Sequence, residues 1–225
     1  MKFFILIFII FTLNSFANIN IIKQNYTISK PIKSWLEFKN ESVVKQQYDY
    51  SCGAGSLSTI LTYFYDKNIT EEAILNSVLK IKSINKDKKE LENSTFDLSF
   101  ADLQEIANLN DFKAIGLAIE LNSLYKLKAP VILYVKIRKD EHFTVFKSID
   151  KNFVYLADPS LGNIKVKISK FKEMFFQRND KKFKGKILAI LPKKEIDKIN
   201  MKNDFLKIEK YSNLIYELIK DKFTQ

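Results

Sequence analysis

The sequence is poor in the residues from which proteins build cross-links and metal sites. It has one cysteine, Cys52, and one histidine, His142, among 225 residues. A single thiol excludes an internal disulfide, and one thiol with one imidazole is too few for the usual zinc cages. The reaction that these two groups most readily carry out together is nucleophilic catalysis, in which a thiolate attacks and an imidazole serves as its base.

Long hydrophobic runs are also scarce. The apolar run at the amino terminus, Phe3 to Leu13, has about eleven residues, whereas a membrane-spanning helix needs about 20. Lys2 precedes this run, and a Ser-Phe-Ala sequence ending at Ala17 follows it with small residues where signal peptidase cuts. Residues 1–17 are therefore predicted to be a signal peptide, with an uncleaved anchor in the inner membrane as the alternative. The rest of the chain is expected to be periplasmic or extracellular.

The net charge of +11 raises the question of a polyanionic partner such as nucleic acid. The lysines are scattered, and acidic residues interleave with the two local clusters at 82–89 and 177–184. No stretch combines basic and aromatic residues in the ladder that would line a nucleic-acid-binding strand. The charge is therefore interpreted as a solvated basic surface, and neither a nucleic-acid partner nor a cofactor is expected.

The hydrophobic periodicity changes from helical to strand-like about halfway along the chain. Apolar residues first recur at helical spacing after Cys52, after a capping residue at Thr70 and after another at Ser99. This order of helices followed by strands predicts an α+β domain, with the helices packed on one side of an antiparallel sheet. Strands are predicted at 112–119, 131–137, 143–149, 153–157, 164–168 and 187–191, with a short connecting helix or turn at 121–127.

The chain is expected to have four parts. They are the signal peptide, a lead-in segment with extended character at 18–42, the main domain at 43–192 and a helical extension at 193–225. A polar stretch at 83–93 is predicted to be a loop. The extension has apolar residues at a roughly helical period, and it is expected either to pack on the domain or to bind a partner.

Cys52 is predicted to begin a helix. Ser51 is a good helix cap, so the thiol would lie in the first turn, where unpaired N–H groups and the positive helix end stabilise a thiolate. Gly53 and Gly55 add little bulk near the sulfur, and they are expected to let a substrate backbone approach. The alternative is an inert buried cysteine, but such a residue does not need small neighbours.

His142 and Asp158 are predicted to meet at one end of a hairpin. If Ile149 pairs with Phe153, His142 lies opposite position 160, close to Asp158. A carboxylate in this place can fix the tautomer of the imidazole and stabilise the imidazolium. The alternative is that Asp158, which precedes a proline, is only part of a turn.

Gln46 precedes the cysteine by six residues. A thiolate that attacks a carbonyl creates an oxyanion, which needs hydrogen-bond donors such as the Cys52 N–H and a side-chain amide. Gln46 and Gln47 are adjacent, so an extended backbone would point only one of them inward. Two solvated glutamines in a loop are the alternative.

Three segments together resemble the bacteriocin-processing cysteine peptidases, also called double-glycine peptidases, over roughly residues 43 to 176. The segments are Gln46-Gln-Tyr-Asp-Tyr-Ser-Cys52-Gly-Ala-Gly-Ser-Leu57, Glu141-His142-Phe-Thr-Val145 and Leu156-Ala-Asp158-Pro159. The resemblance implies a papain-like fold for residues 43–192 and cleavage after a Gly-Gly pair in a narrow groove. It also implies the site roles: Gln46 in the oxyanion hole, Cys52 as nucleophile, His142 as base, Asp158 as its orienter, and Gly53, Gly55 and Phe143 in substrate binding.

The best-known members of this family are cytoplasmic domains of ATP-driven exporters, whereas this sequence has an export signal and no Gly-rich phosphate loop. A stand-alone, exported endopeptidase is therefore expected, with a peptide or protein substrate and a secretion or surface-assembly machinery as partners. Two alternatives remain. One is an amidase or acyltransferase that uses the same thioester chemistry, and the other is a non-catalytic module that binds an extended peptide.

Overall fold

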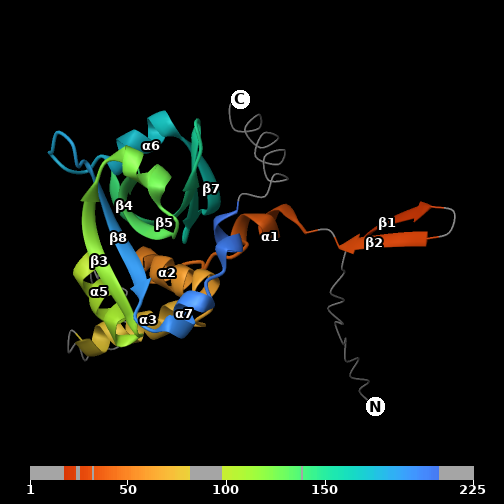
Figure 1. Ribbon diagram of the computed structural model, residues 1–225, viewed down its shortest axis with the longest axis horizontal. Helices are drawn as coiled ribbons and strands as arrows, with labels where there is room; N and C mark the ends of the chain where they lie inside the picture. The colour runs from red at the N-terminus through yellow and green to blue at the C-terminus, as the bar shows by residue number, and fades with distance from the viewer. Residues whose placement is uncertain (1–17, 24–25, 32, 82–97, 138, 208–225) are drawn as a thin grey trace, which may run out of the picture.

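The computed structural model describes residues 18–23, 26–31, 33–81, 98–137 and 139–207 (Figure 1). Its main body is a six-stranded antiparallel sheet in the order β3-β8-β4-β5-β6-β7, with helices on its two faces. The strands of this sheet are β3 (Phe112–Ile119), β4 (Val131–Ile137), β5 (Asp140–Ile149), β6 (Phe153–Asp158), β7 (Gly162–Lys167) and β8 (Gly185–Pro192). The helices before the sheet are α1 (Trp35–Asn40), α2 (Cys52–Thr59), the π-helix η1 (Ile60–Phe64), α3 (Glu71–Ile81) and α5 (Phe100–Leu109). Those within and after it are η2 (Leu121–Lys126), α6 (Ile168–Phe175), α7 (Glu195–Ile199) and η3 (Asn203–Leu206).

The predicted α+β class and order of elements are confirmed. The cap signals act as expected: Ser99 and Asp102 form a reciprocal capping box on α5, and the Thr70 hydroxyl accepts a hydrogen bond from the N–H of Ala73 in the first turn of α3. Among the described residues, no helix has the length and apolar character to cross a membrane.

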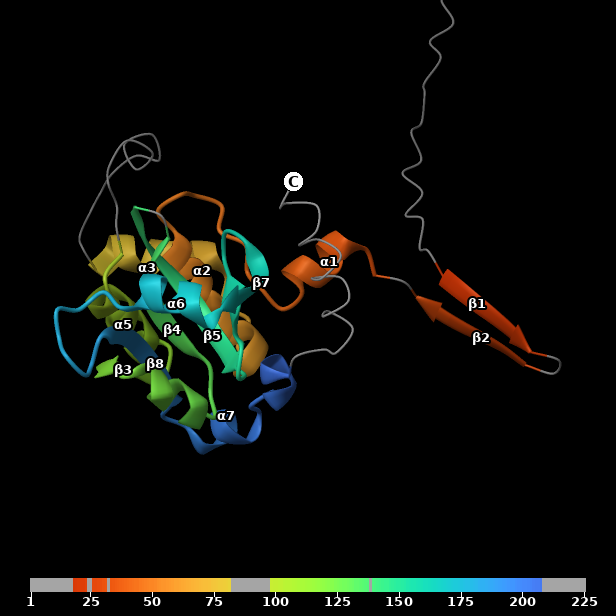
Figure 2. The same cartoon turned by 90° about the horizontal axis from the view of Figure 1, so that it is seen from above.

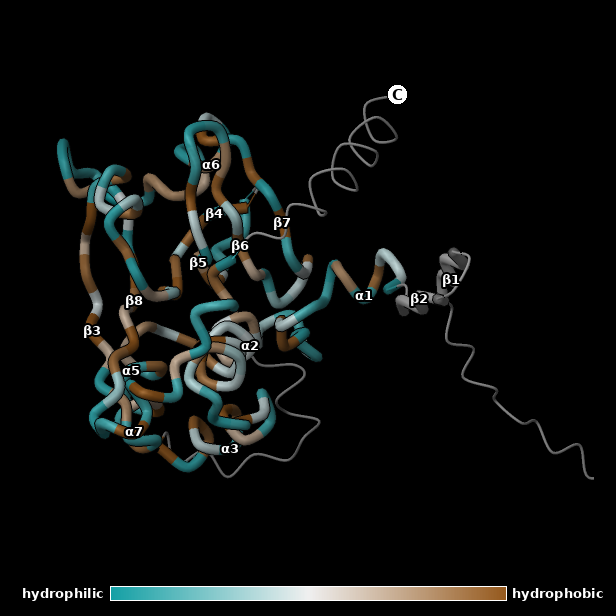
Figure 3. The backbone as a smooth tube through the Cα atoms, turned by 45° about the vertical axis from the view of Figure 1, so that its right-hand side comes forward, coloured by the Kyte–Doolittle hydropathy of each residue, from teal (hydrophilic) through white to brown (hydrophobic). Residues whose placement is uncertain are grey.

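Two hydrophobic clusters lie on opposite faces of the sheet, so helices cover both faces rather than one. Alternate residues of β4 and β5 face each cluster, as a pleated strand requires. On one face, Ile132 and Val145 pack with α2, α3 and α5, and on the other, Leu133 and Phe146 pack with α6. Figure 3 shows the hydrophobic residues recurring along these strands. The first cluster places α2 against β5, and this contact creates the candidate site.

Helix α6 is not among the predicted elements, and the prediction that a strand extends to Ile168 is wrong. Strand β7 ends at Lys167 and the helix begins at the next residue. Phe171, Met174 and Phe175 are buried on one side of the helix, at the spacing of a helical stripe. Strand β5 also begins earlier than predicted, at Asp140, so that His142 lies inside the strand.

The lead-in segment contains a hairpin of β1 (Asn18–Lys23) and β2 (Tyr26–Pro31), which lies away from the main body (Figure 2). Helix α1 follows it and packs against β7, where the side-chain amide of Asn163 donates to the carbonyl of Glu41 at 2.8 Å. The predicted signal peptide at 1–17 and the predicted loop at 83–93 lie outside the described residues.

The first part of the carboxy-terminal extension packs on the body. Phe205 is buried near Phe64, with ring centroids 6.4 Å apart, and the N–H of Lys202 donates to the Phe64 carbonyl at 2.8 Å. Asp197 is fully buried, and its carboxylate lies 2.8 Å from the Lys67 ammonium group. Residues 195–206 are therefore integrated with the body through the end of η1, and 208–225 lie outside the described residues.

Gly185 provides a test of the cluster beneath α6. A Cβ atom at this position would lie 2.0 Å from the ring of Phe175, which is fully buried. Gly185→Ala is therefore expected to lower the free energy of unfolding by about 3 kcal/mol through overpacking, measured as a lower urea midpoint with an unchanged slope. Gly116→Ala is the matched control, because a Cβ atom there would meet nothing within 4 Å. Equal midpoints for the two variants would contradict this packing.

Candidate active site

Cys52 is the first residue of α2, as predicted, but Ser51 does not cap the helix with its side chain. Its hydroxyl instead donates to the carbonyl of Tyr48 at 2.7 Å and accepts from the Tyr48 N–H at 3.2 Å. The Ser51 side chain therefore closes the preceding turn. The N–H groups of the first turn of α2 therefore have no side-chain cap from Ser51. At this end of the helix they favour a negative charge on the Cys52 sulfur.

The sulfur of Cys52 lies against strand β5. The residue is 9% exposed, and its Sγ accepts a hydrogen bond from the Phe143 N–H at 3.4 Å. The Phe143 ring is turned into the protein, where it stacks on Phe100 with centroids 5.1 Å apart and contacts Tyr134 edge-on at 5.7 Å. Phe143 thus presents its backbone, rather than its side chain, to the thiol.

Gly53 and Gly55 are buried, and their small size is explained by packing. A Cβ atom on Gly53 would lie 3.1 Å from the ring of Phe143, and one on Gly55 would lie 2.9 Å from Pro159. These close contacts explain why both positions are glycine. Their role in substrate binding stays a prediction.

His142 and Asp158 lie together, although the pairing predicted for their hairpin is wrong near its turn. Ile149 pairs with Val154 rather than with Phe153, and a bulge between Phe146 and Ser148 then shifts the register by one residue. Beyond the bulge, Val145 lies opposite Ala157, and the same register places His142 opposite position 160. The bulge thus restores the predicted alignment at the end of the hairpin that carries the site.

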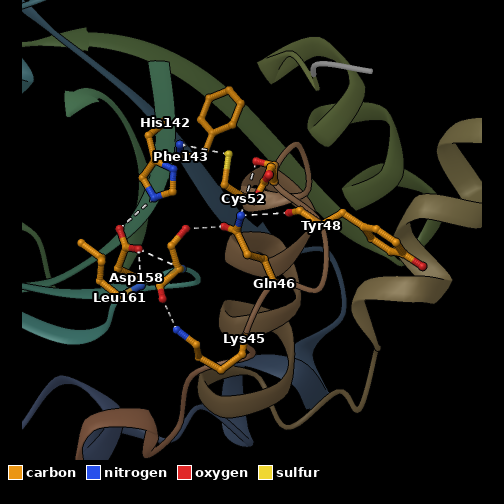
Figure 4. Close-up of polar contacts among 10 residues, drawn as sticks. Lys45, Gln46, Tyr48, Cys52, His142, Phe143, Asp158 and Leu161 are labelled. Atoms are coloured by element: carbon orange, nitrogen blue, oxygen red, sulfur yellow. Dashed lines mark hydrogen bonds and ion pairs between the residues drawn. The ribbon is translucent and has the colours of Figure 1, made fainter. Parts of the chain in front are cut away.

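The carboxylate of Asp158 is fully buried and has a separate partner for each oxygen. Oδ2 lies 2.9 Å from Nε2 of His142, and Oδ1 accepts the N–H groups of Ser160 and Leu161, each at 2.9 Å (Figure 4). Burial alone would raise the pKa of this carboxyl. The hydrogen bonds and charge of His142, together with the backbone donors, outweigh burial and lower the pKa, so Asp158 is an anion.

His142 is held as an imidazolium. Burial alone would lower its pKa, but the hydrogen bonds and negative charges of Asp158 and Cys52 raise the pKa from 6.5 to about 9. Because Nε2 faces Asp158, Nδ1 is the ring nitrogen left for Cys52. The imidazole therefore bridges the thiol and the carboxylate, from a side chain that is only 12% exposed.

The raised pKa of His142 predicts how the free energy of unfolding depends on pH. A pKa raised on folding stabilises the folded state fully below the unfolded value of about 6.5, and this contribution is lost as pH rises through about 9. This contribution is isolated in Cys52→Ala, where no thiol titrates: the free energy of unfolding, relative to the Cys52→Ala/His142→Ala double variant, is expected to fall between pH 6 and 10 through the pairing of His142 with Asp158. Urea titrations across this range measure the difference, and a flat difference would contradict the ion pair.

Gln46 is partly buried beside this group, whereas Gln47 is exposed. The Gln46 side-chain amide donates to the carbonyls of Tyr48 at 2.9 Å and Asp49 at 3.4 Å, and its oxygen accepts from the Ser160 hydroxyl at 2.7 Å. Gln46 and Asp158 thus contact the same turn, as Figure 4 shows. The expectation that only one glutamine points inward agrees with these exposures.

Two further residues contact this loop and were not singled out from the sequence. Ser160 follows the Asp-Pro pair, and Glu71 was interpreted only as an acid at the positive end of α3. In the structure Glu71 is 3% exposed, and both of its carboxylate oxygens accept the Gln47 N–H, at 3.0 and 3.2 Å. Its position next to a helix cap could have drawn attention to it, but its burial depends on tertiary packing.

No group of three or more His, Cys, Asp or Glu residues that could hold a metal ion occurs in the part of the chain that the structure describes. The chemistry available at the site is that of the thiol, the imidazolium and the two polar side chains beside them. This set suits attack on a carbonyl carbon, with donors nearby for the resulting oxyanion.

Comparison with known proteins agrees with this chemistry. Two curated relatives are each named "Probable functional amyloid protease FapD". The one from Pseudomonas fluorescens is 33% identical over 136 residues, which are 60% of this chain and 58% of the relative. The one from Pseudomonas aeruginosa is 30% identical over 144 residues, 64% of this chain and 61% of the relative. The matches thus span about three fifths of these relatives' length.

Two solved structures of peptidase domains are also similar, each over 67% of this chain. One is a double glycine motif protease from an AMS/PCAT transporter in complex with the leader peptide, at 22% identity, 90% coverage of that chain and a TM-score of 0.48. The other is the peptidase domain of Streptococcus ComA, a bifunctional ABC transporter of a quorum-sensing pathway, at 16% identity, 97% coverage and a TM-score of 0.49.

The profile of the peptidase C39 family matches residues 40–195. This range contains the thiol, the imidazole, the carboxylate and the amide of the site, and it coincides closely with the body around the six-stranded sheet. The family resemblance inferred from the sequence is confirmed: the chain belongs to the peptidase C39 family.

Proposed function

We propose that the protein is an exported cysteine endopeptidase. The observation that carries the proposal is the alignment of three side chains, in which Asp158 holds Nε2 of His142 at 2.9 Å and leaves Nδ1 for Cys52. Cys52 is the nucleophile, His142 its base and Asp158 the residue that orients the imidazole. Gln46 and the Cys52 N–H are the donors for the oxyanion.

The proton of Cys52 already resides on Nδ1 of His142 before substrate binds, so the reaction starts from a thiolate beside an imidazolium. The thiolate attacks the carbonyl carbon of the scissile peptide bond, and the tetrahedral oxyanion is stabilised by the two donors. When the intermediate collapses, His142 returns the proton to the leaving amine and a thioester remains. His142 then takes a proton from a water molecule, which hydrolyses the thioester, releases the acid product and restores the thiolate beside the imidazolium.

The side-chain NH₂ group of Gln46 is bound to two loop carbonyls, and one of these hydrogen bonds must break before the group can donate to the oxyanion. Of its two bonds to backbone carbonyls, the one to Asp49 at 3.4 Å is much the longer, and hydrogen bonds of that length are weak. An oxyanion is a stronger acceptor than a neutral carbonyl. Substrate therefore replaces the Asp49 carbonyl while the bond to Tyr48 keeps the amide in place.

The substrate is a protein that is cut after a pair of small residues, of the Gly-Gly type. Cys52 is 9% exposed, and the side chain of His142 is only 12% exposed, so a substrate can reach little of the surface of these two residues. A large side chain next to the scissile bond would have to displace protein atoms, which disfavours it. The names of the relatives suggest a component of a functional amyloid system as the protein that is processed.

The test is the reactivity of the thiol as a function of pH. Iodoacetamide is expected to modify Cys52 readily at pH 6, because the imidazolium of His142, whose pKa is raised to about 9, stabilises the thiolate. An unassisted thiol is mostly protonated below about pH 8.5 and reacts slowly there. His142→Ala should slow modification at pH 6 at least about tenfold.

Cys52 is the only cysteine, so the extent of labelling reports this residue alone. Gln46→Ala is the matched control, because this amide does not contact the imidazole and labelling does not form an oxyanion. Peptide libraries with Gly-Gly sites then define the substrate. A thiol that reacts only at alkaline pH in the wild type would contradict the peptidase and favour a peptide-binding module.

A further inference from the structure

Gln46 is held from two directions, through its own N–H and side chain and through the N–H of the next residue. One side is the turn after β6. There the Pro159 carbonyl accepts a hydrogen bond from the Gln46 N–H at 3.0 Å, and the Ser160 hydroxyl donates one to the side-chain oxygen of Gln46 at 2.7 Å. On the other side, the carboxylate of Glu71 accepts the Gln47 N–H. The two sides come from elements far apart in the chain, since the turn follows the sheet strand β6 and Glu71 begins helix α3.

Ser160 determines which end of the Gln46 amide faces the loop. Its hydroxyl donates to the amide oxygen, so the amide nitrogen faces the two backbone carbonyls of Tyr48 and Asp49. The flipped amide would bring its oxygen against two carbonyl oxygens, which repel it. The same residue donates its backbone N–H to Asp158 at 2.9 Å. Ser160 therefore links the carboxylate that orients His142 to the amide that faces the oxyanion.

Glu71 fixes the backbone that carries this amide. A buried carboxylate costs free energy unless hydrogen bonds and favourable charge compensate it, and Glu71 is 3% exposed at the positive end of α3. The N–H that it binds belongs to the residue directly after Gln46. Rotation of the peptide unit between Gln46 and Gln47 would break these hydrogen bonds, so the carboxylate fixes the backbone from which the Gln46 side chain projects.

We propose that Ser160 and Glu71 are positioning residues, which place the amide of Gln46 for oxyanion binding. The inference rests on the proposed function of Gln46. Neither residue touches the reacting atoms. Each acts through Gln46, the hydroxyl by orienting the amide and the carboxylate by fixing the backbone.

The kinetic test uses Ser160→Ala and Glu71→Gln with a Gly-Gly peptide. Each is expected to lower kcat about tenfold with little change in KM, a part of the roughly 10²- to 10³-fold that an oxyanion donor contributes. Ser160→Thr keeps the hydroxyl and should restore most of the rate. The matched controls are Ser169→Ala and Glu72→Gln, which alter exposed residues of the same types and should retain wild-type kcat.

A double-mutant cycle separates positioning from general damage. In the Gln46→Ala background, neither Ser160→Ala nor Glu71→Gln should lower kcat further, because the amide on which both act is gone. Effects that multiply with that of Gln46→Ala would overturn the proposal. So would a loss of rate that follows a loss of folded protein in urea titrations.

The side-chain NH₂ resonances of Gln46 provide a test that needs no activity. They are assigned by their absence in Gln46→Ala, and in Ser160→Ala they should shift and show faster motion on the ps–ns timescale. Unchanged Gln46 resonances in both positioning variants would overturn the proposal even if the wild type cleaves peptides. Conversely, a wild type that cleaves nothing would refute the peptidase function, while the resonances still decide whether Ser160 and Glu71 hold the amide.

Discussion

Replacing Cys52 with alanine is expected to lower the rate of peptide cleavage by at least about 10⁴-fold. Without the thiol no thioester can form, and the remaining donors and binding contacts supply only the small residual catalysis seen when a nucleophile is removed. Cleavage of a Gly-Gly peptide by purified wild type and variant, followed by mass spectrometry of the products, measures the loss. Full cleavage by the variant would refute a covalent mechanism.

The fold of this variant must be shown to persist. The sulfur is largely buried, and the hydrogen bond that it accepts from the Phe143 N–H is long, at 3.4 Å, so its removal should cost about 1 kcal/mol of unfolding free energy. Cys52→Ser is a second variant that keeps the shape of the side chain and should be equally inactive, because a hydroxyl is far harder to ionise than a thiol. A sharp fall in melting temperature for both would instead mark Cys52 as a structural core residue.

The sequence predicted that the thiol and the imidazole come together, because their chemistry is local and their residue types are rare. The chain has one thiol, at the start of a helix rich in small residues, and one imidazole, in a strand, so no other Cys/His pair can form. The face of the strand on which His142 lies follows from the alternation of side chains along a strand. Asp158 could be added because it lies within reach along the same hairpin. These inferences need only neighbours in the sequence or across one turn.

The parts that sequence reasoning missed depend on packing. The hydroxyl of Ser51 closes a turn rather than capping α2, because the Tyr48 backbone lies within its reach. The bulge in β5 could not be predicted, because side chains alternate between the two faces of the strand both before and after it. Glu71 is an ordinary first-turn acid in the sequence, and only the approach of the Gln47 backbone gives its carboxylate a partner.

Asp158→Asn is expected to be at least as damaging as Asp158→Ala, with kcat lowered by about 10³- to 10⁴-fold. The reason is the pair of backbone N–H groups from Ser160 and Leu161, which bind Oδ1. In the asparagine variant these donors retain the amide oxygen, so the NH₂ group must face Nε2 of His142. Nε2 must then accept, the ring proton moves to Nδ1, and Nδ1 can no longer take the proton of Cys52.

The tautomer can be observed directly, because His142 is the only histidine of the chain. With ¹⁵N-labelled histidine, the wild type should show both ring nitrogens protonated below about pH 9, whereas Asp158→Asn should show protonation of Nδ1 alone at neutral pH. Asp180→Asn is the matched control, since Asp180 also binds two backbone N–H groups, from Lys182 and Phe183 at 2.8 Å, in a different turn. If Asp158→Asn kept the imidazolium and a near-normal kcat, the two backbone donors would not control the carboxylate, and the orienting role of Asp158 would have to be abandoned.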